Sequence, residues 1–129
     1  MANVLVTSES RYPVKRKFVR EVVLRTLKAN RIGDKVEVSV AIVGDRKMRQ
    51  LSKQYRGLDK TTDVLSFTFE EASQGSGRGP DGFLRLGEVI VSYPQVRVAA
   101  IKRNRMLDDI LAELVEHGCL HLLGRHHPE

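Results

Sequence analysis

All four histidines of the chain lie within the eleven residues 117–127, near the C-terminus. His117 and His121 are four residues apart in a segment with helical periodicity, so their imidazoles project from one helix face, one turn apart. Two imidazoles placed in this way can bind one metal ion. Gly124 permits a left-handed turn that brings the chain back, and His127 can then supply a third ligand. Three protein ligands with one position open for water are typical of a catalytic zinc site. We therefore predict one Zn²⁺, bound by His117, His121 and His127.

The histidines also have two interpretations without a metal ion. The helix dipole favours a histidine near a helix C-terminus without any ligand, and a terminal cluster can be the remnant of a purification tag. A tag does not explain His117 and His121, which lie inside an amphipathic helical segment. The ligand spacing equals that of metzincin peptidases, but Gly118 stands where those enzymes carry their glutamate general base. The chain therefore shares the ligand spacing of a peptidase without the group that activates its water.

A second candidate site lies at Arg56, where a predicted helix ends and a short segment leads to a strand that opens at Asp63. An arginine at such a junction suits two-point contact with a phosphate group. The alternative is a surface arginine that only caps the carbonyl groups of its helix. Further along, Gly87 inside a predicted strand indicates a bulge or a close backbone approach. The next residue, Glu88, either faces the metal site or is simply solvated.

The periodicity of apolar residues predicts the elements that must position these groups. Strands are expected at residues 3–7, 35–43, 63–70 and 84–93. Helices are expected from 10–13 to 30–33, from 45 to 56, from 94 to 103 and from 107 to 123. We expect Asp45 to cap the second helix and residues 71–82, rich in Gly, Ser and Pro, to form a loop. This order predicts one α+β domain over residues 1–129, with helices against a mixed sheet.

Length and composition limit the class of protein. The chain has 129 residues, of which 41% are apolar and 29% are charged, as expected for one soluble domain. Its longest apolar runs fall short of the ~18 residues of a membrane span, and the first residues lack the pattern of a signal peptide. The single cysteine, Cys119, excludes an intrachain disulfide and fits a buried core thiol better than a ligand. A cytoplasmic location is therefore expected.

The excess positive charge is confined to the first quarter of the chain. Residues 1–35 carry nine basic and three acidic residues, whereas residues 36–129 carry thirteen of each, so the net charge of +6 belongs to the first segment. The basic residues fill the polar side of the first predicted helix. They either solvate that face or form an electrostatic footprint for nucleic acid.

Three blocks of the sequence together resemble the YbeY family of bacterial rRNA maturation factors. They are Y-R-G-x-D-K-x-T-D-V-L-S-F at Tyr55 to Phe67, L-G-[DE]-[IV] at Leu86 to Val89, and H-G-x-L-H-L-x-G-x-D-H at His117 to His127. Their order and spacing extend the resemblance over nearly the whole chain. It implies a mixed four-stranded sheet flanked by helices, with a zincin-like metal site on the C-terminal helix. It also implies zinc ligands at His117, His121 and His127, with Arg56 and His117 acting in RNA cleavage.

The resemblance implies a zinc-dependent endoribonuclease specific for single-stranded RNA, acting in 16S rRNA maturation and ribosome biogenesis. Its expected partners are single-stranded RNA or rRNA, the small ribosomal subunit and the proteins of that subunit. Three departures accompany it: His126 replaces an aspartate, Thr61 replaces a proline, and the chain stops at Glu129 where relatives continue with another helix. The aspartate would orient a metal-bound imidazole, and a histidine does not supply the same charge. Without the further helix, the site is expected to be less shielded and the metal to be held less firmly.

The sequence is also compatible with two other functions. One is a metallohydrolase of another substrate class, including an unusual peptidase. The other is a ribosome assembly factor that binds RNA and holds zinc for structural reasons. Three ligands with an open position favour catalysis, and cleavage of RNA with and without His121 separates the alternatives.

Overall fold

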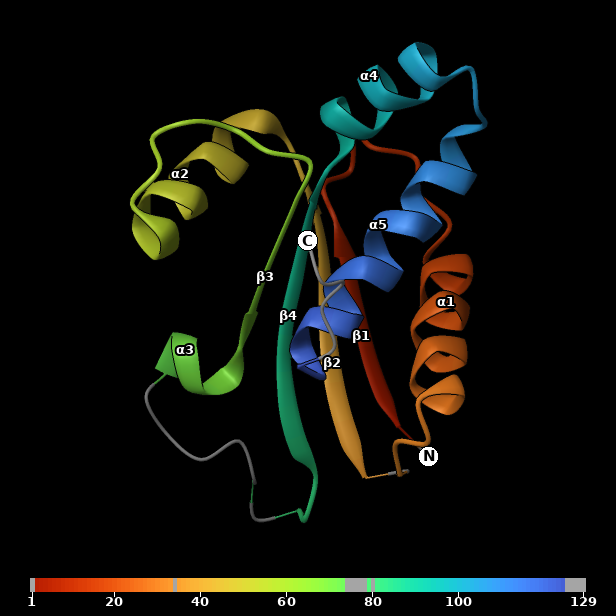
Figure 1. Ribbon diagram of the computed structural model, residues 1–129, viewed down its shortest axis with the longest axis vertical. Helices are drawn as coiled ribbons and strands as arrows, with labels where there is room; N and C mark the ends of the chain where they lie inside the picture. The colour runs from red at the N-terminus through yellow and green to blue at the C-terminus, as the bar shows by residue number, and fades with distance from the viewer. Residues whose placement is uncertain (1, 34, 74–78, 80, 125–129) are drawn as a thin grey trace.

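A computed structural model describes residues 2–33, 35–73, 79 and 81–124 (Figure 1). The strands are β1 (Asn3–Ser8), β2 (Val36–Val43), β3 (Val64–Thr68) and β4 (Leu84–Ser92). The helices are α1 (Arg16–Ala29), α2 (Asp45–Arg56), α3 (Phe69–Ser73), α4 (Tyr93–Arg103) and α5 (Leu107–Leu122). These elements confirm the predicted α+β class.

The four strands form one sheet in the order β1-β2-β4-β3. β2 pairs in parallel with both β1 and β4, whereas β3 pairs antiparallel with β4. The sheet is therefore mixed, as predicted, and β3 lies at one edge. In Figure 1, α1 and α5 lie side by side on one face of this sheet, whereas α2 and α3 lie beside β3.

Alternation along the strands divides the core into two clusters. Val38 and Val40 of β2 join Val89 and Val91 of β4 in the larger cluster, beneath α1 and α5. The residue between the latter two, Ile90, faces the opposite side and belongs to a smaller cluster beneath α2. Both faces of the central strands are thus buried near α2, as expected for strands with parallel partners. Farther from α2, the short helix α3 lies beside the described part of this second face.

Gly87 occupies the irregularity predicted from its place in a strand. The register of β4 against β2 shifts between Glu37 and Val38, so that Val38 pairs with Gly87. Gly87 has φ +147°, and a Cβ atom there would overlap the carbonyl oxygen of Phe67 on β3. A side chain is therefore excluded by the close approach of the neighbouring strand.

One predicted helix start and one predicted cap are wrong. Helix α1 begins at Arg16 instead of at residues 10–13, because Tyr12 closes a turn onto Glu9 and stacks on Tyr93, with ring centroids 5.0 Å apart. Helix α2 is capped by Gly44 and not by Asp45. The Asp45 carboxylate instead accepts hydrogen bonds from Thr61, Ser92 and Gln95, which hold the segment after α2 against the end of β4.

The predicted strand over residues 63–70 ends early, at Thr68. A short helix, α3, follows at Phe69–Ser73, inside a region predicted to be strand and then loop. Thr68 and Glu71 form a reciprocal capping box: the backbone N–H of Thr68 donates to Glu71 Oε1 at 2.9 Å, and the backbone N–H of Glu71 donates to Thr68 Oγ1 at 3.2 Å. The pattern Thr-x-x-Glu was the available signal for this helix.

Candidate active site at the edge of the sheet

The two helical histidines lie in the last turns of α5. His117 is exposed and His121 is half-buried. The apolar side of the same helix, which includes Val115, Cys119 and Leu122, faces the main core. The core packing of α5 therefore leaves His117 and His121 one turn apart and outside the buried surface.

The end of α5 has the turn that the metal hypothesis requires. Gly124 has φ +73° and its N–H donates to the carbonyl of His121 at 2.9 Å, so the chain leaves the helix through a left-handed residue. The predicted third ligand, His127, and its neighbour His126 lie outside the described residues. Within the described ranges, no group of three potential ligands gathers around one point.

The donor chemistry at the end of α5 nevertheless fits zinc. Imidazole nitrogens are common zinc ligands, and the pair at His117 and His121 has the separation used by helical zinc motifs. Cys119, the one thiol of the segment, does not compete. It is buried, and this burial raises its pKa to about 12, so it stays protonated. The residues present thus offer two nitrogen ligands from one helix and no thiolate.

Gly118 allows α5 to lie directly on the sheet. It is buried, and a Cβ atom at this position would lie 2.5 Å from Cγ1 of Val89. No glutamate side chain fits between α5 and β4 here. The missing general base of the metzincin pattern therefore has a steric reason, and the structure argues against peptidase chemistry of that type.

We expect Gly118→Ala to lower the free energy of unfolding by about 1–3 kcal/mol, because the methyl group must push Val89 from a closely packed site. Urea denaturation followed by circular dichroism measures this change. Gly33→Ala is the matched control, since a Cβ atom at Gly33 meets nothing within 4 Å. Equal stability of the two variants would contradict the close approach of α5 and β4.

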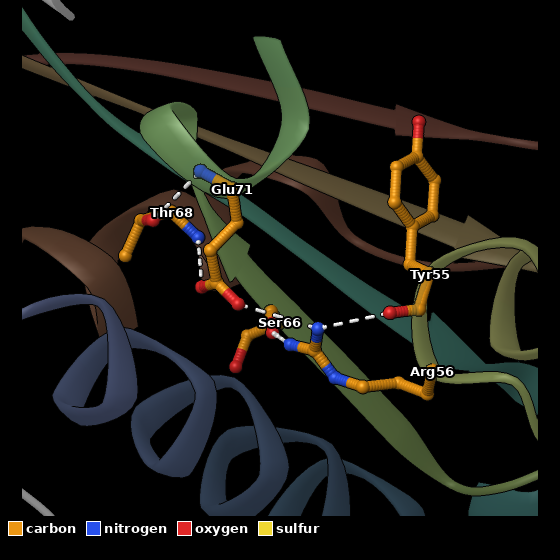
Figure 2. Close-up of polar contacts among 5 residues, drawn as sticks. All are labelled: Tyr55, Arg56, Ser66, Thr68 and Glu71. Carbon is orange, nitrogen blue, oxygen red and sulfur yellow. Dashed lines mark hydrogen bonds and ion pairs between the residues drawn. The ribbon is translucent and has the colours of Figure 1, made fainter. Parts of the chain in front are cut away.

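Arg56 is the last residue of α2, and its guanidinium reaches across to the edge strand (Figure 2). Nη2 donates to the carbonyl oxygen of Ser66 on β3 at 2.6 Å, and Nη1 lies 3.3 Å from Glu71 Oε2. Nη1 also donates to the carbonyl of Tyr55 at 3.3 Å, so the capping alternative holds in part. The other two contacts bridge different elements. Gly57, with φ +69°, ends the helix directly behind Arg56.

Glu71 lies on α3 beside the arginine. The pKa of Glu71 is lowered, chiefly by the hydrogen bond from the Thr68 backbone and further by the charge of Arg56. Arg56 also contacts β3, and β3 packs against α5, so the arginine and the histidine helix meet the same edge strand. The Arg56 side chain is 31% exposed and that of Glu71 is 42% exposed, so solvent and substrate have access to the pair.

Glu88 does not face the histidines. Val89 and Val91 of β4 point toward α5, so Glu88, one residue away from Val89, points to the opposite face of the sheet. It is half-buried there and lies in a separate cavity with Ser39 and Phe67. Of the two alternatives for Glu88, the one in which it faces the metal site is therefore wrong, and the half-buried side chain is not fully solvated either.

The charge analysis also missed a basic surface beside Arg56. Helix α2 exposes Arg46, Lys47, Arg49 and Lys53 in addition to Arg56. Averaging charge over residues 36–129 hid this group, because acidic residues elsewhere in the segment cancel it. Counting charge by element would have found it.

The structure is a single α+β domain with a polar site at the edge of its sheet. Known proteins share this fold. The chain resembles the solution structure of TM1509 from Thermotoga maritima with a TM-score of 0.61 and 26% identity, over 97% of this chain and 75% of that one. Residues 6–129 match the family model described as endoribonuclease YbeY.

Relatives named endoribonuclease YbeY match most of the chain. One from Dehalococcoides mccartyi is 37% identical over 98% of this chain and 78% of its own length. Another from Roseiflexus castenholzii is 38% identical over 84% of this chain and 68% of its own length. The chain belongs to the endoribonuclease YbeY family. Within the described ranges, no helix has both the length and the apolar run that crossing a bilayer requires.

Proposed function

We propose that the protein is a zinc-dependent endoribonuclease that cleaves single-stranded RNA during maturation of ribosomal RNA in the cytoplasm. The observation that carries the proposal is that Arg56 contacts β3 and α3 at the sheet edge, and that β3 also packs against α5, the helix of His117 and His121. Membership of the endoribonuclease family supports RNA as the substrate. The small ribosomal subunit and its proteins are the partners proposed with it.

Each polar group has a proposed role in cleavage. His117, His121 and His127 would hold Zn²⁺, which as a Lewis acid activates an oxygen nucleophile and offsets charge on phosphoryl oxygens. Arg56 would contact the phosphate through the planar N–H groups that now reach Ser66 and Glu71, and would stabilise the negative charge that develops on its oxygens. Glu71 would orient Arg56 until RNA binds.

Strand selectivity tests the proposed substrate class. A labelled RNA should be cut when single-stranded and protected when annealed to its complement, because the bond must reach Arg56 at the end of α2. The products also identify the nucleophile, since attack by the adjacent 2′-hydroxyl leaves a cyclic phosphate and attack by water does not. Equal cleavage of the duplex would contradict the single-strand assignment.

The basic face of α1 is proposed to supply affinity and not chemistry. This helix packs beside α5 and along β1, and β1 lies at the opposite edge of the sheet from β3. We expect Lys15→Glu, Arg16→Glu and Lys17→Glu together to weaken RNA binding and to flatten its salt dependence. Cleavage at saturating RNA should keep its rate.

The measurement for α1 is binding of labelled RNA across a salt series. Arg20 is left unchanged because its Nε donates to the carbonyl of Val4 and so ties α1 to β1. Unaltered affinity and salt slope in the triple variant would show that the basic residues of α1 only solvate a helix face.

A further inference from the structure

The face of the sheet opposite α5 holds a cavity of about 260 Å³ that the proposed chemistry does not use. It lies beyond the part of that face that α2 covers, between the open strands and α3. Its lining combines aromatic, hydroxyl and carboxylate groups. The lining includes Ser39, Phe67, Phe69 and Glu88.

Strand register places the polar and aromatic groups side by side. Glu88 on β4 is paired with Ser39 on β2 and with Phe67 on β3, and all three belong to the cavity lining. Phe67 is 3% exposed and belongs to the buried cluster beneath α2, whereas Phe69 at the start of α3 is only partly buried. Phe67 stacks on Tyr55 of α2, with ring centroids 4.5 Å apart. The lining thus places a carboxylate beside a hydroxyl group and the partly buried aromatic ring of Phe69, an arrangement suited to a flat, polar-edged ligand.

Glu88 is prepared to accept hydrogen bonds. Its carboxyl group is half-buried, and no side-chain hydrogen bond to it is found within the described residues. Burial raises its pKa, while the ammonium group of Lys47 on α2 opposes that rise. The other carboxylate of the cavity, Glu37, is already paired with Arg85 at 3.3 Å. Glu88 is therefore the acceptor available to a ligand.

The cavity adjoins the Arg56 site through one short segment. Thr68, Phe69 and Ala72 line the cavity. From the same segment, Glu71 contacts Arg56. The cavity and the Arg56 site thus meet at residues 68–72, along which an RNA strand with its phosphate on Arg56 would continue to the cavity.

We propose that this cavity binds a guanine base of the single-stranded RNA, adjacent to the bond that is cleaved; the proposal rests on the proposed function. Single-stranded bases are recognised by stacking on aromatic rings and by hydrogen bonds to their edges. Guanine presents two adjacent donors, its ring N1–H and its exocyclic amine, to the two acceptor oxygens of a carboxylate. Adenine and cytosine each place an unprotonated ring nitrogen beside their amine, which a carboxylate repels.

Cleavage kinetics with paired substrates test the guanine proposal. The substrates are single-stranded oligomers of A and U with one central guanosine, or with inosine, which lacks the exocyclic amine, in its place. We expect kcat/KM of the unmodified protein to fall about tenfold from guanosine to inosine, in the range of one lost two-point base contact. Glu88→Gln should lower cleavage of the guanosine substrate by a similar factor and remove the difference between substrates. Glu37→Gln, the control in the same cavity, should keep the difference.

Binding of free nucleotides separates failure of this proposal from failure of the proposed function. In ¹⁵N-labelled protein, 5′-guanylate should shift the amide signals of Ser39 and Glu88, and 5′-adenylate should not. These shifts without any RNA cleavage would support the cavity and contradict the proposed function. Cleavage that treats guanosine and inosine alike, or equal shifts by the two nucleotides, would overturn the guanine proposal.

Discussion

We expect the unmodified protein to bind close to one equivalent of zinc per chain and the His121→Ala protein to lose this zinc. His117 and His121 offer their imidazoles from one face of α5, and a site left with two ligands no longer completes the coordination of zinc. Loss of even an outer partner of a zinc ligand weakens affinity about 10- to 100-fold, so loss of a ligand should exceed this range. Metal analysis after dialysis measures the stoichiometry, with any tag removed. His117→Ala and His127→Ala should behave alike.

Cys119→Ala is the matched control for the ligand assignment. Cys119 lies between the two histidines in the sequence, but its thiol is buried in the core and its pKa is raised to about 12. Zinc content should therefore stay near one equivalent in this variant. Retention of zinc by both His117→Ala and His121→Ala would show that the metal binds elsewhere.

Arg56→Ala should lower the rate of RNA cleavage by on the order of 10²–10³, the usual cost of removing one group that stabilises transition-state charge. Zinc content and the circular dichroism spectrum should be retained, because the contacts of Arg56 with Tyr55, Ser66 and Glu71 are exposed. Arg56→Lys should restore part of the rate, since an ammonium group cannot make the planar two-point contact. Single-turnover cleavage at saturating RNA measures the chemical step.

Arg49→Ala controls for the loss of one positive charge from α2. Arg49 lies two turns before Arg56, is exposed, and pairs with Asp59 at 2.7 Å. Its replacement should leave the single-turnover rate close to that of the unmodified protein. Unimpaired turnover by Arg56→Ala, or an equal loss in both variants, would remove Arg56 from the chemistry.

Strongly periodic segments were predictable from the sequence. The alternation and final apolar run of residues 35–43 predicted a central strand, and β2 does lie between two partners. The helical spacing of residues 107–123, followed by Gly124, predicted α5 and its end to within one residue. In these segments, burial of one helix face or of both strand faces determines the structure. The periodicity of apolar residues indicates this burial directly.

Elements fixed by contacts distant in the sequence were not predictable. Tyr12 stacks on Tyr93, and Asp45 is held by Ser92. The first contact accompanies the later start of α1, and the second uses the carboxylate that local rules placed at the cap of α2. The side to which Glu88 points depends on which face of β4 is covered by α5. The sequence of one strand does not determine which face that is.

The two motifs of the candidate site were predictable from the sequence. Their position at the same edge of the sheet was not. The sequence suggested histidine ligands and a phosphate-binding arginine, but it held no sign that Arg56 reaches β3, the strand that packs against α5. The contact of Arg56 with Glu71 depends on α3, a helix of five residues. Short elements stabilised by their caps leave little periodic signal.

Cleavage of one labelled single-stranded RNA by unmodified and His121→Ala protein, purified in parallel, tests the central claim most directly. Chelation should abolish cleavage by the unmodified protein, and added Zn²⁺ should restore it. The His121→Ala protein should be inactive with or without Zn²⁺, which also excludes a contaminating ribonuclease shared by both preparations. If the two proteins cleave at the same rate, or if the unmodified protein binds RNA and zinc without cutting, the protein is not the metal-dependent endoribonuclease proposed here.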